Sequence, residues 1–132
     1  MRNRLIYICS PLRGDIEKNI QKAQGYCREA VDLWPDVIPI APHVYCTQFL
    51  DDTIPQEREV GMELGIALLD MCDELWVYGI NNPSEGMKKE ITYAKAHGIP
   101  VKDAANLYRL REQEKNRQED KELGDALLVL PT

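Results

Sequence analysis

Short apolar runs alternate along the first hundred residues with longer segments in which apolar residues recur every three or four positions. The runs at residues 5–9, 37–42, 74–79 and 99–102 have the length and composition of β-strands. The longer segments begin near Asp15, Thr53 and Ser84 and have the spacing of helices. Strands that alternate with helices of this length predict an α/β fold with a parallel sheet and right-handed crossovers.

Capping residues mark the starts of the three predicted helices. Asp15 and Ser84 can each accept a hydrogen bond from a first-turn N–H group. Thr53 has the same role in the middle helix, followed by Pro55 in the first turn and Gln56 as the capping-box partner. The apolar stripe of that helix consists of Val60, Leu64, Ala67 and Met71.

The C-terminal part has a different pattern. Ten of the fourteen residues at 109–122 are charged, five of each sign, which predicts a solvated helix or a partly disordered tail. The apolar residues 127–130 follow and would need a docking surface on this chain or on a neighbouring subunit. The chain is therefore expected to divide into an α/β domain at residues 1–105 and a charged helical tail at residues 106–132.

Composition narrows the class of protein. The 132 residues are 44% apolar and include 16 Lys+Arg against 22 Asp+Glu, a net charge of −6. One hydrophobic core is possible at this length, and the acidic excess argues against nucleic-acid polymers and anionic membranes as partners. No membrane span, signal peptide, paired cysteine motif or metal site is predicted, so a cytoplasmic protein without cofactor is expected.

The charge is unevenly distributed along the chain. Residues 29–85 contain twelve acidic and one basic residue, whereas residues 1–28 contain six basic and two acidic residues. This distribution favours a small anionic ligand, such as a single nucleotide, near the first strand.

Ligands of open parallel sheets bind beyond the carboxyl ends of the strands, where the strand order reverses. If the four predicted strands, numbered along the chain, lie in the order 2-1-3-4 in the sheet, the order reverses between strands 1 and 3. The loops that follow these two strands are residues 10–15 and 79–86. Each loop leads into a helix N-terminus with free N–H groups, and Arg13 adds a full positive charge. Each loop alone is explained by an ordinary turn, but two converging loops favour a ligand site.

Glu90 is the strongest candidate for chemistry. It lies about one turn into the third helix, on the flank of the face set by Met87 and Ala94, and points along the mouth of the crevice. A solvated glutamate would have the same spacing. His43 could reach the crevice or make structural hydrogen bonds, and Asp52 lies in an acidic cluster that could bind sugar hydroxyls or simply face solvent.

Two segments contain recognisable motifs, Tyr7-Ile8-Cys9-Ser10-Pro11-Leu12-Arg13-Gly14 and Ser84-x-Gly86-x-x-x-Glu90-x-x-x-Ala94-x-x-x-Gly98-Ile99-Pro100-Val101. They resemble the nucleoside 2-deoxyribosyltransferase superfamily, which includes deoxynucleoside-monophosphate N-glycosidases. The resemblance covers residues 4 to about 102. It implies a flavodoxin-like or Rossmann-like three-layer fold with four or five strands.

The resemblance also implies an enzyme, a transferase or hydrolase that acts on a 2-deoxynucleoside or its 5′-monophosphate and forms homo-oligomers. Glu90 would be the nucleophile, kept ionised by N–H donors that lower its pKa, and Tyr7 would orient it or lie beside the sugar. The substrate-binding residues implied are Ser10, Arg13, Gly14, Ser84, Gly86, His43 and Asp52.

One position departs from that family. Its enzymes usually have an Asp eight residues before the position of Asp73, where this chain has Gly65. Glu63, Asp52 or Asp70 could replace it. The alternative is a non-catalytic nucleotide-binding module or sensor subunit that retains the crevice.

Overall fold

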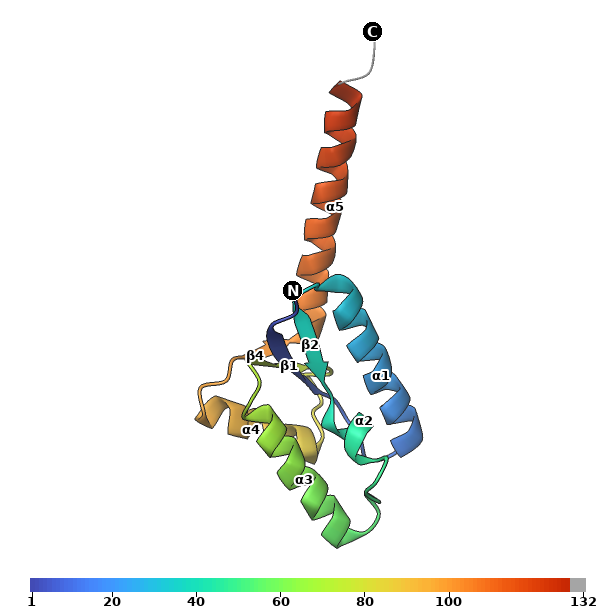
Figure 1. The fold of residues 1–132 in the computed structure, drawn as a ribbon, viewed down its shortest axis with the longest axis vertical. Helices are drawn as coiled ribbons and strands as arrows, with labels where there is room; N and C mark the ends of the chain where they lie inside the picture. The colour runs from blue at the N-terminus through green and yellow to red at the C-terminus, as the bar shows by residue number, and fades with distance from the viewer. Residues whose placement is uncertain (129–132) are drawn as a thin grey trace.

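The computed structural model describes residues 1–128 and contains a four-stranded parallel sheet (Figure 1). Its strands are β1 (Arg4–Cys9), β2 (Val37–Ile40), β3 (Glu74–Val77) and β4 (Val101–Asp103). They lie in the order β2-β1-β3-β4, so the predicted order and parallel sheet are confirmed, with no fifth strand in the described residues.

Helices cover both faces of the sheet. They are α1 (Ile16–Leu33), α2 (Pro42–Cys46), α3 (Pro55–Leu69), α4 (Glu85–Ala96) and α5 (Ala104–Leu128). The buried residues form one cluster with α3 and α4 and a second cluster with α1 and the start of α5. The protein is therefore a three-layer α/β/α fold.

Strand β1 is buried on both faces, as its continuous apolar sequence predicts. Ile6 and Ile8 belong to the cluster on the α1 side, while Tyr7 and Cys9 belong to the cluster on the α3–α4 side. This alternation directs Tyr7 toward the layer that contains α3 and α4.

Two of the three predicted caps are confirmed. Asp15 accepts a hydrogen bond from the Lys18 N–H at 3.2 Å, and Ser84 accepts one from the Met87 N–H at 3.3 Å. The predicted Thr53 cap is wrong, because Ile54 occupies the N-cap position and makes no side-chain cap. The Thr53 hydroxyl donates instead to the Asp51 carboxylate at 2.6 Å, so an Asx-type turn competes with the cap.

The predicted inner face of α3 is also wrong. Val60, Leu64 and Met71 are 43%, 37% and 61% exposed, and Ala67 is exposed as well. The side of α3 that packs inward contains Gly61, Met62, Gly65, Ile66 and Leu69. The helix is apolar on two opposite sides, and the side with two glycines is the one that can approach β1 closely.

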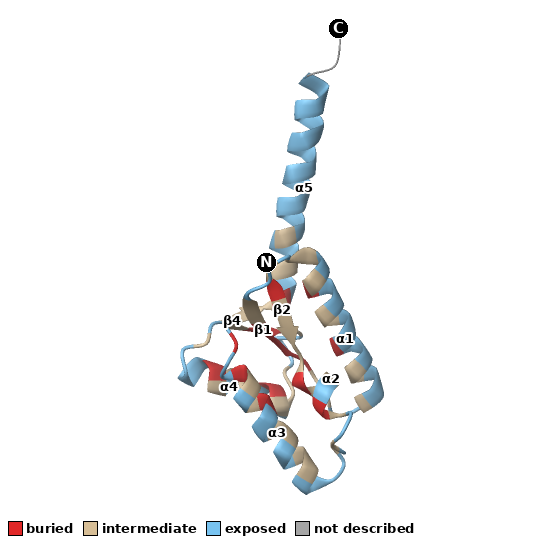
Figure 2. Ribbon diagram, viewed as in Figure 1, coloured by how far each residue is buried: buried red, intermediate tan, exposed pale blue. Residues whose placement is uncertain are grey.

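Helix α5 packs against the domain only through its first two turns. Ala104 is buried, Arg111 Nε donates to the Leu33 carbonyl at 2.9 Å, and the Tyr108 hydroxyl lies 2.6 Å from that of Tyr78. The remainder projects away from the domain and is exposed, so the solvated-helix prediction is confirmed (Figure 2). Of the apolar residues 127–130, the first two are exposed and the last two lie outside the described residues.

Within residues 1–128, no helix combines the length and apolar character needed to cross a membrane.

Candidate functional site

A cavity of about 390 Å³ opens at the carboxyl ends of β1 and β3, where the strand order reverses. It is lined by the loop after β1, by the start of α4, and by residues of α2 and α3. Of the nine residues singled out from the sequence, the cavity brings together Tyr7, Ser10, Arg13, His43, Asp52, Ser84, Gly86 and Glu90.

Gly14 is the residue that the cavity does not include. It is exposed and has a φ of 102°, in the left-handed region that suits glycine. In the structure, Gly14 makes the turn between Arg13 and the helix cap Asp15.

Glu90 and Tyr7 meet at the inner end of the cavity. Tyr7 is 3% exposed, and it lines the same cavity as the half-buried Glu90, close enough for its hydroxyl to influence the pKa of the Glu90 carboxyl. A hydroxyl that donates to a carboxylate stabilises the negative charge. Hydrogen bonding to Tyr7 therefore favours the charged form of Glu90.

Burial outweighs that hydrogen bond and raises the pKa of Glu90 to about 7. The prediction of a lowered pKa is therefore wrong. No backbone N–H of the described residues donates to the Glu90 carboxylate, because Glu90 lies a full turn beyond the free N–H groups of the α4 N-terminus.

Ser10 and His43 form a second polar pair in the cavity wall. The Ser10 Oγ lies 3.3 Å from His43 Nε2, and Ser10 is 5% exposed. Burial lowers the pKa of His43 to about 4, so the imidazole is neutral near pH 7. His43 belongs to α2, and this short helix directs it into the cavity.

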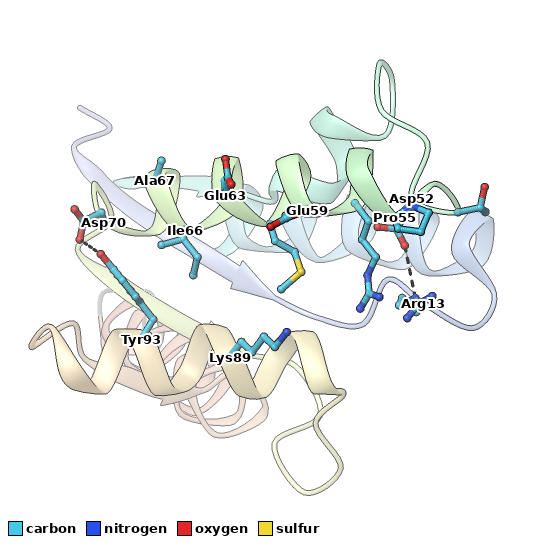
Figure 3. Close-up of a pocket in the computed structure, with 13 residues that line it drawn as sticks. Arg13, Asp52, Pro55, Glu59, Glu63, Ile66, Ala67, Asp70, Lys89 and Tyr93 are labelled. Carbon is cyan, nitrogen blue, oxygen red and sulfur yellow. Dashed lines mark hydrogen bonds and ion pairs between the residues drawn. The ribbon is translucent and has the colours of Figure 1, made fainter.

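Positive charges gather where the cavity meets an open groove of about 700 Å³ between α3 and α4 (Figure 3). Arg13, Arg58 and Lys89 line both. Arg58 was not identified from the sequence, and Lys89 was interpreted there as simply exposed. The position of Lys89 beside Glu90 is the one signal that could have found it.

Asp52 lies near these cations. Its Oδ2 is 3.8 Å from Arg13 Nε, is buried, and makes no hydrogen bond. It is therefore an acceptor that faces the junction of cavity and groove. Figure 3 shows the Arg13–Asp52 pair at one end of the groove and Tyr93 with Asp70 at the other.

Gly65 of α3 lines the cavity directly. Of the three carboxylates that could replace the expected Asp, only Asp52 reaches the cavity; Glu63 and Asp70 line the groove instead. Across residues 1–128, no three His, Cys, Asp or Glu side chains are grouped in a way that could hold a metal ion.

Two solved structures have a similar fold. One is a 2-deoxyribosyltransferase from the psychrotolerant bacterium Bacillus psychrosaccharolyticus, with 16% identity, a TM-score of 0.57, and coverage of 74% of this chain and 69% of that chain. The other is a 2-desoxiribosyltransferase from Leishmania mexicana, with 19% identity, a TM-score of 0.52, and coverage of 75% and 62%.

This chain thus spans less than two thirds of the Leishmania protein's length. At these identities the similarity establishes a nucleoside 2-deoxyribosyltransferase-like fold. No curated protein matches the chain.

A family model described as a domain of unknown function, DUF7768, matches residues 4–104. The match runs from the first residue of β1 to the first residue of α5 and so includes every lining residue of the cavity. The chain belongs to the DUF7768 family.

Proposed function

We propose that this protein cleaves the N-glycosidic bond of a 2-deoxynucleoside or its 5′-monophosphate, or transfers the deoxyribosyl group, with Glu90 as the nucleophile. The observation that carries the proposal is the Glu90 carboxyl facing the Tyr7 hydroxyl inside a cavity of about 390 Å³. A cavity of this size is in the range that binds small molecules. The fold shared with two 2-deoxyribosyltransferases supports the same activity.

The chemistry needs a carboxylate next to the anomeric carbon. Glu90 attacks that carbon, the carbon–nitrogen bond breaks, and its electron pair leaves with the base, which takes up a proton from water. The resulting glycosyl ester is then attacked by water or by a second base, with net retention of configuration. Tyr7 would orient the Glu90 carboxylate, while Ser10, His43 and Ser84 are available for hydrogen bonds to the sugar.

The cations at the mouth of the cavity favour the 5′-monophosphate over the nucleoside. Arg13, Arg58 and Lys89 come from three different elements and converge on the same side. Asp52 also lies at this junction and pairs with Arg13, so three cations face one carboxylate there. The excess positive charge would attract a phosphate dianion, whereas an uncharged 5′-hydroxyl gains little from it.

Base release tests the proposal. Purified protein is incubated with a panel of 2-deoxynucleosides and their 5′-monophosphates, and the free base is measured for wild type, Glu90→Ala and Glu29→Ala. Glu29 is an exposed glutamate of α1 that takes no part in the cavity lining, and it serves as the control. We expect Glu90→Ala to lower the rate by roughly a thousandfold or more and Glu29→Ala to leave it unchanged.

A non-catalytic nucleotide-binding module is the second candidate. The glycine at position 65, where the family it resembles has an Asp, favours it. In that case no substrate releases base, while a deoxynucleoside monophosphate still raises the melting temperature of the protein. Base release that is equal in wild type and Glu90→Ala would contradict the proposed nucleophile.

A further inference from the structure

Gly65 is the glycine of the fold with the tightest surroundings. A Cβ atom at this position would lie 3.3 Å from the Tyr7 hydroxyl oxygen and 3.9 Å from Pro42 Cβ. Gly61, one turn earlier in α3, has only an ordinary contact of 3.7 Å with Leu50 Cδ1. The close approach is therefore specific to the Tyr7 hydroxyl rather than general to the inner side of α3.

The Tyr7 hydroxyl has little freedom to move elsewhere. The ring is 3% exposed and packs in a cluster with Leu69, Leu75 and Met87. The hydroxyl thus lies between α3 at Gly65 and α4 at Glu90. A side chain at position 65 would displace the hydroxyl by a few tenths of an ångström and change its contact with the Glu90 carboxyl.

We propose that Gly65 is a positioning residue, whose missing side chain leaves the space in which the Tyr7 hydroxyl meets Glu90. The inference rests on the proposed function, because it assigns Gly65 to the orientation of the proposed nucleophile. An Asp at position 65 would lie against the Tyr7 hydroxyl and compete with Glu90 for its hydrogen bond.

The Glu90 carboxyl has other polar and charged neighbours in the cavity. Cys9 on β1 lies near it. The other charged residues of the lining, together with His43, are Arg13, Asp52, Glu57, Arg58, Glu85 and Lys89. A test that compares variants with and without the Tyr7 hydroxyl holds all of these groups constant.

The experiment is a double-mutant cycle on Gly65 and Tyr7. Its readout is the pKa of the Glu90 carboxyl, measured by carbon-13 NMR titration of the full-length protein without substrate. The proteins are wild type, Gly65→Ala, Tyr7→Phe and the double variant, with Gly61→Ala as the matched control. Both glycine replacements gain the same helix propensity, and the close contact with the Tyr7 hydroxyl is the main difference between the two sites, since the other contacts are ordinary ones of 3.7 and 3.9 Å.

We expect Gly65→Ala to raise the Glu90 pKa by about 0.5 or more in the presence of Tyr7, because the hydrogen bond that favours the carboxylate is weakened. In the background of the Tyr7→Phe substitution, and for Gly61→Ala, the change should be less than half as large. Equal changes in both backgrounds, or none in either, would overturn the proposal.

The result of the titration does not depend on whether the proposed function is correct. The titration reports on Glu90 whether or not the protein releases base, and base release by wild type is measured without any change at Gly65. The two measurements can therefore fail independently: the titration tests whether Gly65 sets the contact between Tyr7 and Glu90, and base release tests whether Glu90 is a nucleophile.

Discussion

Glu90 is subject to two opposing influences. Burial favours its neutral form, and the Tyr7 hydroxyl favours its charged form, with burial prevailing so that the pKa reaches about 7. A carboxylate poised there is a stronger base, and a better nucleophile when ionised, than one with an ordinary pKa. The cost is that part of the population is protonated at neutral pH.

The same pKa makes Glu90 a determinant of stability. Because folding raises the pKa from its ordinary 4.5 to about 7, the folded state holds the proton more tightly. This stabilisation is complete below pH 4.5 and is lost as pH rises through 7. We therefore expect Glu90→Gln to increase the free energy of unfolding relative to wild type by on the order of 2 kcal/mol more at about pH 8.5 than at about pH 5.

Urea unfolding of both proteins at the two pH values measures this difference. An identical effect of the substitution at the lower and the higher pH would mean that the carboxyl titrates normally.

Lys88 and Lys89 are adjacent in sequence but differ in surroundings. Lys89 lines the cavity and the groove, whereas Lys88 is ion-paired with Glu85 at 3.1 Å on the exposed side of α4. For a protein that acts as proposed, Lys89→Ala should lower kcat/KM for the 5′-monophosphate by about tenfold and hardly change it for the nucleoside. Lys88→Ala is the control, and equal losses for both substrates would exclude a role of Lys89 in phosphate recognition.

At the scale of elements, α5 is anchored by a few residues and otherwise solvated. Tyr108 packs against Trp34 with ring centroids 5.1 Å apart, and Arg111 binds the carbonyl at the end of α1. Beyond Glu114 every described residue is exposed. A chain that ends at Glu114 should keep the melting temperature within about 2 °C, whereas Tyr108→Ala should cost about 3 kcal/mol.

Thermal and urea unfolding of the shortened chain and of Tyr108→Ala test this boundary. A large loss on shortening would show that the distal part of α5 packs on something in solution.

The sequence predicts an element best where a single pattern dominates. The continuous apolar run of β1 and the caps of α1 and α4 each have one interpretation, and all three are confirmed. Helix α3 has apolar residues on two opposite sides, so periodicity alone could not say which side faces the sheet. The choice depends on tertiary contacts, such as the one between Gly65 and Tyr7, 58 residues apart in sequence, which no local pattern contains.

The same limit applies to the site. The loops after β1 and β3 could be predicted because strand order determines where they meet. Arg58 and Gly61 could not, because both depend on the side of α3 that turns inward. The raised pKa of Glu90 depends on how deeply α4 seats that carboxyl, which is a property of packing rather than of spacing.

At the scale of the whole molecule, the two faces of the sheet have different roles. The α1–α5 side contains an aromatic cluster. Tyr26 stacks on Tyr78 with ring centroids 4.1 Å apart, and Trp34 packs edge-on against Trp76 with ring centroids 4.8 Å apart. The α3–α4 side contains the cavity, the groove and the glycines of α3. The densely packed side fixes the sheet, and the more open side is free to bind a ligand.

The outer side of α3 has several exposed apolar side chains. Val60, Leu64 and Ala67 of α3, with Met71 just beyond its end, form an exposed apolar stripe on the side of the helix away from the sheet, and Ala67 also borders the groove. A helix that is apolar on two sides is expected to be covered on both. A second copy of this chain could cover it, because a two-fold axis would pair the stripe with itself.

We therefore expect the protein to form a dimer through α3, which sedimentation equilibrium measures directly. Leu64→Glu would place a charge in the centre of the stripe and should raise the dissociation constant at least about tenfold, because an unpaired carboxylate would be buried in the interface. Gln21→Glu, an equivalent charge on exposed α1, should leave the association unchanged. The prediction is wrong if the wild type stays monomeric over the full concentration range, or if the Leu64→Glu variant still dimerises as the wild type does. The stripe would then face solvent or a different partner.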